Sequence, residues 1–111
     1  MKIDKDYLAR IIINLVTNAS QAKADNRKSV INVDIEKIEK RIKIIVNDNG
    51  VGISPDKLEK IFDPNFTSKN SGMGIGLTMV KRMVEDYNGT ITVVSEVDKG
   101  ATFTISMPSN L

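Results

Sequence analysis

Residues 31–50 read INVDIEKIEKRIKIIVNDNG, and this stretch decides the fold. Apolar and polar residues alternate over 31–36, and the apolar residues recur at every second position over 42–46, where only Ile45 interrupts the polar positions; the polar link 37–41 lies between the two runs. Alternation with a period of two is typical of a strand that buries one face. The stretch therefore predicts a hairpin of two strands, which the Asp-Asn-Gly at 48–50 brings to an end.

The segments on both sides of this hairpin predict helices and a second pair of strands. Residues 4–24 carry apolar side chains at the helical period, Pro55 opens a short helix over 54–62, and a third helix begins near Gly74. Gly89 is placed to end that helix, and two closing strands follow at 90–97 and 101–107. The order α-β-β-α-α-β-β, without repeat or linker, predicts an α+β fold: a two-layer sandwich of a sheet and helices.

Length and composition limit the possible functions. The 111 residues fit one compact domain spanning 1–111, and a net charge of +2 gives no reason to expect binding to nucleic acid or to a membrane surface. Cysteine is absent, which excludes disulfides and thiolate metal sites, and a cytoplasmic location is permitted. Histidine is also absent, so no histidine base, metal ligand or phosphate acceptor exists in this chain.

A glycine cluster, Gly72-Met73-Gly74-Ile75-Gly76, immediately precedes the third predicted helix. Glycine lets an anion approach the backbone closely, and a helix N-terminus offers unpaired N–H groups, so phosphate is the natural ligand. No Gly-Lys-Ser/Thr follows, and no first strand precedes the cluster, which excludes a Walker A loop and a dinucleotide fingerprint. A flexible loop that enters an ordinary helix stays open as the alternative.

Asp48 follows a strand whose apolar residues share its face, so its side chain is predicted to point toward the core. An ionised carboxylate there is costly without partners. It can accept a hydrogen bond from an exocyclic amine such as that of adenine, while Gly50 and Gly52 leave space for the ring. The alternative is an aspartate that only makes the Asp-Asn-Gly turn.

Three further polar side chains are candidates for phosphate and metal chemistry. Asn14 and Asn18 lie four residues apart beside the apolar stripe of the first helix, where asparagine costs roughly 0.7 kcal/mol relative to alanine. An amide oxygen from Asn18 suits Mg²⁺, which takes few protein ligands. Lys69, in the irregular loop before the glycines, is placed to close over a terminal phosphate. Solvent exposure is the alternative for all three.

Five segments of the chain, in this order, resemble the sequence boxes of one family: 14–22, 48–52, 61–69, 72–77 and 100–103. The chain resembles the catalytic ATP-binding domain of sensor histidine kinases, within the GHKL superfamily that also holds gyrase, MutL and heat-shock chaperone ATPases. Its short loop is most similar to nitrogen-regulation-type kinases. Each box alone is weakly specific, whereas five in sequence are very specific.

The resemblance implies a Bergerat fold, in which three helices cover one face of a mixed, mostly antiparallel sheet. It implies that the domain binds Mg-ATP: Asp48 reads adenine, Asn18 holds Mg²⁺, Lys69 approaches the γ-phosphate, and Gly74 and Gly76 cradle phosphates. It places further nucleotide contacts at Gln21, Ala22, Gly50, Gly52, Ile53, Phe62, Thr67, Ser68, Gly72, Met73, Ile75, Leu77 and Thr102.

The resemblance also implies the reaction. Asn14 stands where the hydrolysing relatives have a water-activating glutamate, and because an amide cannot act as that base, transfer of the γ-phosphate to a protein histidine is favoured. The acceptor must lie on a separate dimerisation domain of the same or a partner kinase, with a response regulator downstream. The domain alone is expected to be a cytoplasmic monomer. A GHKL-type ATPase, a serine-directed kinase and a non-catalytic nucleotide-gated module stay open as alternatives.

Three residues depart from the pattern of the family. Gln21 replaces a basic residue and Ala22 an aromatic one, which weakens one phosphate contact and one wall of the site. Ala101 lacks a hydroxyl that relatives carry near adenine, unless Thr102 takes its place.

Overall fold

A computed structural model describes the main chain of residues 5–62 and 73–108 and, apart from those of 73–76, their side chains. The order of elements is the one that the sequence predicts. The helices and strands are α1 Lys5–Gln21, β1 Ile31–Ile38, β2 Arg41–Asp48, α2 Pro55–Leu58, α3 Met73–Asp86, β3 Thr90–Glu96 and β4 Gly100–Pro108.

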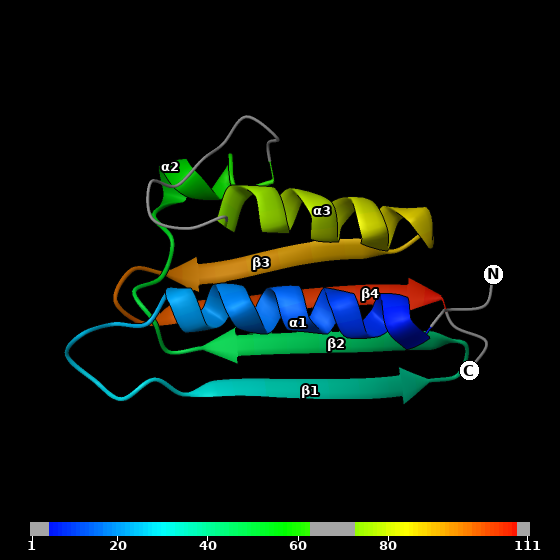
Figure 1. The fold of residues 1–111 in the computed structure, drawn as a ribbon, viewed down its shortest axis with the longest axis horizontal. Helices are drawn as coiled ribbons and strands as arrows, with labels where there is room; N and C mark the ends of the chain where they lie inside the picture. Colours follow the sequence, from blue (N-terminus) through cyan, green and yellow to red (C-terminus); the bar gives the residue numbers. More distant parts are fainter. Residues whose placement is uncertain (1–4, 63–72, 109–111) are drawn as a thin grey trace.

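The four strands form one sheet in the order β1-β2-β4-β3 (Figure 1). The sequence predicts a mixed, mostly antiparallel sheet, but every pairing among the described strands is antiparallel. The reason is topological: two hairpins meet at their inner strands, β2 and β4, which run in opposite directions. In the register of these inner strands Asp48 stands opposite Ala101, and Ile42 opposite Met107.

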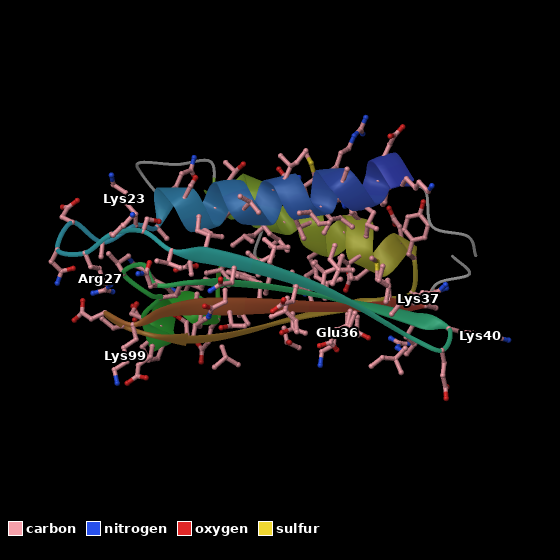
Figure 2. All side chains as sticks on the ribbon, turned by 90° about the horizontal axis from the view of Figure 1, so that it is seen from below. Lys23, Arg27, Glu36, Lys37, Lys40 and Lys99 are labelled. Atoms are coloured by element: carbon pink, nitrogen blue, oxygen red, sulfur yellow. The ribbon has the colours of Figure 1, made fainter. Side chains whose placement is uncertain are left out.

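Two helices, α1 and α3, lie side by side on one face of the sheet, so that helices and sheet form two layers (Figures 1 and 2). The helices and the inner strands bury their apolar side chains between the layers. No helix in the described ranges is long and apolar enough to cross a membrane. The fully buried side chains are Ile11, Leu15, Ile44, Val46, Ile61, Leu77, Val80, Val84, Ile105 and Met107.

The second predicted helix is much shorter than expected. The sequence predicts it over 54–62, whereas α2 is one turn, beside the start of α3 in Figure 1. Its remaining residues continue as turns, with Lys60 N–H donating to Lys57 O at 2.8 Å. Leu58, Ile61 and Phe62 pack on the core, and all three lie in the second half of the predicted range, so they stabilise little more than one helical turn.

The ends of the two long helices also differ from expectation. The first helix ends at Gln21 instead of near residue 24. The carbonyl of the next residue, Ala22, accepts the N–H of Val51 at 2.8 Å instead of continuing the helix. At the end of α3 the left-handed residue is Asn88 (φ 60°), and Gly89 N–H returns to a carbonyl of the helix. Asparagine tolerates this conformation, so Gly89 is not needed for it.

The outer strand β1 is largely uncovered. Val33 and Ile35 share the face of the core, because they pair with Val46 and Ile44. They are nevertheless 41% and 52% exposed, since α1 lies over β2 and its contacts with β1 are few (Figure 1). The buried residues of the sheet therefore lie in the inner strands β2 and β4, and Asp48 is one of them.

Candidate functional site

The candidate site is built around the turn that follows β2. Asp48 is the last residue of β2 and is only 4% exposed, and its side chain faces the helical layer as the strand alternation predicts. Its Oδ1 accepts the main-chain N–H of Gly50 at 2.8 Å. The carboxylate is thus buried and held by the main chain of its own turn.

The environment of Asp48 disfavours its charged form. Burial raises the pKa of this carboxyl above its ordinary value, and hydrogen bonds from the main chain of Gly50 and Ala101 oppose part of that rise. A buried carboxylate with a perturbed pKa is a common mark of a functional site. A ligand that donates a hydrogen bond to it would stabilise the ionised form.

The glycines of this turn are required by the packing of the chain on itself. A Cβ on Gly50 would meet the carbonyl of Ala22, at the end of α1. Gly52 has φ +75°, and a Cβ there would meet the carbonyl of Glu96, at the end of β3. The sequence predicts that both glycines leave space for a ligand ring, but the structure gives a different reason, since both face main chain.

Hydrogen bonds join this turn to two other segments. Val51 N–H donates to Ala22 O, and Asp98 N–H donates to Val51 O, both at 2.8 Å. Arg27, which is not among the residues predicted for the site, also donates to carbonyls of the turn. No spacing or period in the sequence marks Arg27, because its partners come together only on folding.

The amide of Asn18 is the second buried polar group of the site. Asn18 lies one turn before Ala22 on α1 and is 6% exposed, and its Nδ2 has no hydrogen-bond partner in the described part of the chain. Asn14, one turn earlier, is half-buried. A buried amide hydrogen without a partner is costly, so a bound group that accepts from it would be stabilised here.

The first turn of α3 supplies main-chain donors. Met73 begins the helix, Gly74, Ile75 and Gly76 continue its first turn, and Leu77 is fully buried beneath. The first N–H groups of a helix have no partner within the helix and suit an anion.

The remaining predicted residues are spread around these elements. Phe62 is half-buried; its carbonyl accepts Thr78 Oγ1–H at 3.2 Å, and Lys81 Nζ lies 5.6 Å from its ring centroid. Ile53 is half-buried, and its N–H donates to Ser95 Oγ at 2.7 Å. Ala22 is half-buried and Gln21 is exposed. The predictions for Thr67, Ser68, Lys69 and Gly72 lie outside the described residues.

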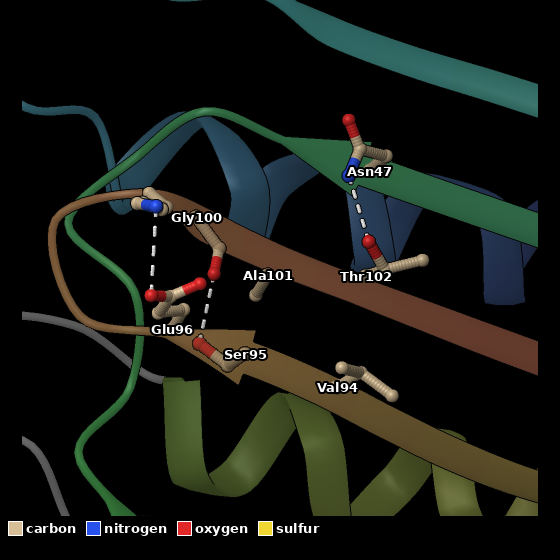
Figure 3. A pocket seen from close by; sticks show the side chains of 8 residues that line it. Asn47, Val94, Ser95, Glu96, Gly100, Ala101 and Thr102 are labelled. Atoms are coloured by element: carbon tan, nitrogen blue, oxygen red, sulfur yellow. Dashed lines mark hydrogen bonds and ion pairs between the residues drawn. The ribbon is translucent and has the colours of Figure 1, made fainter.

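Thr102 does not belong to this site. Its Oγ1 accepts Nδ2–H of Asn47 at 2.7 Å on the sheet face away from the helices, next to an open hollow of about 420 Å³ (Figure 3). Alternate residues of a strand face opposite sides, and Ala101 is the one that stands beside Asp48. Thr102 therefore cannot supply the hydroxyl that Ala101 lacks.

Comparisons with known proteins agree with this geometry. The family described as histidine kinase-, DNA gyrase B- and HSP90-like ATPases matches residues 3–111. The chain is 41% identical over 111 residues to the sensor histidine kinase ZraS of Escherichia coli (strain K12), covering 100% of this chain and 23% of that protein. It thus spans about a quarter of the length of that relative.

Solved structures are similar over nearly the whole chain. The catalytic domain of the histidine kinase ThkA, in a nucleotide-free form, superposes with a TM-score of 0.80 at 31% identity, covering 96% of this chain and 68% of that domain. Full-length ShkA in complex with AMPPNP has a TM-score of 0.77 at 27% identity, covering 92% of this chain and 21% of that protein.

Proposed function

Because the chain belongs to the family of histidine kinase-, DNA gyrase B- and HSP90-like ATPases, we propose that it binds Mg-ATP and transfers the γ-phosphate to a histidine on a separate domain. It is a catalytic domain of the sensor histidine kinase type. The proposal concerns the ligand contacts, the acceptor and the cellular setting, which we take to be the cytoplasm.

The buried carboxylate of Asp48 carries the proposal. Its two main-chain donors, Gly50 and Ala101, leave acceptor capacity on a group that has four lone-pair positions. The exocyclic amine of adenine is a donor of the right kind, and burial strengthens such a bond. The relative ShkA was solved with AMPPNP, which supports an adenine nucleotide as the ligand of this domain as well.

The residues at the end of α1 fit a magnesium–phosphate group. No group of three or more histidine, cysteine or acidic side chains gathers in the described ranges, but Mg²⁺ needs only one or two protein ligands beside phosphate oxygens. Turning the unpartnered amide of Asn18 presents either its N–H₂ to a phosphate or its oxygen to the metal. When bound, Mg²⁺ would neutralise part of the charge on the phosphates.

The phosphate end of the nucleotide is assigned to α3 and the segment before it. The first turn of α3, with Gly74 and Gly76, would donate N–H groups to phosphate oxygens. Lys69 would approach the γ-phosphate, and Thr67, Ser68 and Gly72 would line the same side. Catalysis would consist mainly of positioning and charge stabilisation, as in other phosphoryl transfers.

The acceptor histidine must come from elsewhere, because the chain contains none. We place it on a dimerisation domain of the same or a partner kinase, with a response regulator as the later recipient. Asn14 favours transfer over hydrolysis, since an amide cannot deprotonate water. Sustained ATP hydrolysis by this chain alone would instead favour the ATPase alternative.

Calorimetric titration of ATP with and without Mg²⁺ tests the nucleotide site. We expect binding that Mg²⁺ strengthens and that Asp48→Asn weakens at least about 100-fold, because an amide hydrogen would face the donor of the base. Asp34→Asn makes the same chemical change on the exposed strand β1 and should bind like the wild type. Absence of binding at millimolar ATP would refute the site.

Incubation with a histidine-bearing dimerisation domain of a similar kinase tests the reaction. We expect phosphate that is labile in acid and stable in base to appear on the added domain and not on this chain. Phosphate on serine, or none on any acceptor while ATP still binds, would leave the binding site standing and refute the histidine kinase activity.

A further inference from the structure

The guanidinium group of Arg27 joins three separate segments. Its Nε–H donates to the carbonyl of Asn49 at 2.7 Å, and its Nη2–H groups donate to the carbonyls of Gly50 at 2.7 Å and Asp98 at 2.6 Å. Arg27 itself lies in the loop between α1 and β1, at the end of the molecule where Lys99 of the β3–β4 turn also lies (Figure 2). One side chain thus ties the loop to both turns.

These carbonyls have particular need of such a donor. Asn49 and Gly50 follow the last residue of β2, and Asp98 lies between β3 and β4, so none of the three has a ladder partner for its carbonyl. Arginine presents several N–H groups in a rigid planar fork, and hydrogen bonds from a charged donor are stronger than neutral ones. The half-buried Arg27 therefore holds the turn more firmly than a neutral side chain would.

The turn that Arg27 holds is the one that orients Asp48. Gly50 donates its N–H to Asp48 Oδ1 at 2.8 Å and offers its carbonyl to Arg27. The same residue is thus bound on one side by the carboxylate and on the other by the guanidinium. Arg27 contacts the outer side of the turn, and the carboxylate faces the core.

We propose that Arg27 is a positioning residue of the nucleotide site, which sets the preference for adenine by fixing the turn that orients the Asp48 carboxylate. It does so without a contact to the nucleotide. This inference rests on the proposed function, since it assumes that Asp48 receives a hydrogen bond from the base.

The preference between purines depends on how firmly the carboxylate is held. Inosine triphosphate carries a carbonyl where adenine carries its amine, so a fixed carboxylate attracts the one base and repels the other. A carboxylate on a loosened turn can move away from the inosine carbonyl and also loses alignment with the adenine amine. Loss of Arg27 should therefore reduce the preference for ATP over inosine triphosphate.

The test compares Arg27→Gln with Lys28→Gln, which removes the same charge from the same loop. The ammonium of Lys28 is exposed and hydrogen-bonds to no described residue. Dissociation constants for ATP, ADP and inosine triphosphate are measured by calorimetry at a temperature at which circular dichroism shows each protein folded. We expect Arg27→Gln to reduce the ATP preference over inosine triphosphate about tenfold and Lys28→Gln to change it less than about twofold.

Other outcomes separate the possible failures. If Arg27→Gln lowers the melting temperature but keeps the wild-type preference, Arg27 is only structural and the inference is wrong. If the ratio of ATP to ADP affinity falls together with the ratio of ATP to inosine triphosphate affinity, the variant distorts the whole site. That result also overturns the inference. A wild type that binds no ATP refutes the proposed function itself.

A second variant guards against loss of folding. Arg27→Lys keeps a charge that can reach one or two of the three carbonyls. If Arg27→Gln does not fold, Arg27→Lys should still bind ATP. Its preference for ATP over inosine triphosphate should be smaller than that of the wild type but not absent. An undiminished preference in Arg27→Lys would contradict the inference.

Discussion

The two glycine clusters of this chain look alike in sequence, but Gly50 and Gly52 lie in a turn after β2, whereas Gly74 and Gly76 lie in the first turn of a helix. In the first, Gly50 and Gly52 approach the main-chain carbonyls of Ala22, just after α1, and of Glu96, in β3, and Val51 between them is hydrogen-bonded to both neighbouring segments. In the second, Gly74 and Gly76 belong to the first turn of α3, with helical main chain. Packing of the chain on itself accounts for the first cluster, whereas phosphate binding is our proposal for the second.

This difference bears on how glycine motifs are interpreted. Glycine is used wherever backbone must come close to something, and that partner can be another part of the chain or a bound phosphate. Substitution by alanine separates the two cases, because a Cβ that meets main chain destabilises the fold, whereas a Cβ that meets only a ligand weakens binding.

The largest expected effect is that of Gly50→Ala. The new Cβ would overlap the carbonyl of Ala22, which already accepts the N–H of Val51, so neither segment can withdraw without losing that bond. We expect the free energy of unfolding to fall by about 3 kcal/mol or more, measured by urea denaturation. A loss of less than about 1 kcal/mol would show that the turn tolerates a side chain, and would contradict the explanation of Gly50 by packing.

Gly52→Ala should have an effect of similar size, about 3 kcal/mol, from its positive φ and from the carbonyl of Glu96. Gly52→Asn separates the contribution of the backbone conformation from that of the contact with Glu96, because asparagine tolerates positive φ but still carries a Cβ. Equal losses of unfolding free energy in both variants would identify the contact with Glu96 as the main cause of the destabilisation. Recovery in the asparagine variant would identify the backbone conformation.

Gly76→Ala should act in the opposite direction on stability. Alanine is favoured over glycine inside a helix by about 0.5–1 kcal/mol, so the domain should become slightly more stable. If this turn receives phosphate, affinity for ATP should nevertheless fall several-fold while affinity for adenosine does not change. Unchanged ATP affinity would support the alternative of a loop that enters an ordinary helix.

The smallest expected effect is a pH dependence centred on Asp48, whose pKa burial raises. For a carboxyl with a raised folded-state pKa, the stabilising contribution is complete below the unfolded value of about 3.9 and is lost as pH rises through the folded pKa. The unfolding free energy of the wild type relative to Asp48→Asn should therefore increase as pH falls through that raised pKa. ATP affinity should decrease over the same range, because protonation removes the charged acceptor. A flat difference would show that Asp48 is solvated like an ordinary surface aspartate.

The sequence was most informative where a pattern is local. Strand alternation placed Asp48 on the buried face, and the helical period placed Asn18 beside the core; the structure confirms both. The same alternation could not show that Val33 and Ile35 stay partly exposed on β1. Coverage of a strand depends on where a helix from another part of the chain comes to lie.

The features of the site that the sequence did not predict have one cause in common. Thr102 was expected beside adenine, but the register that sets Ala101 opposite Asp48 turns it to the other face of the sheet. Gly50 and Gly52 were expected to leave space for a ring, and the structure adds a second reason for glycine at both positions, the close approach of main chain. Both outcomes depend on contacts between segments about 30 to 55 residues apart, which no local period encodes.

The sequence by itself determined the order of helices and strands, the α+β fold class and the family, because periodicity, turn residues and ordered motifs are properties of neighbouring residues. Only the tertiary structure decided which glycines serve packing, which residue stands beside Asp48, and that Arg27 holds its turn. Those features arise when three loops meet at one end of the sheet, and their hydrogen bonds exist only once the chain has folded.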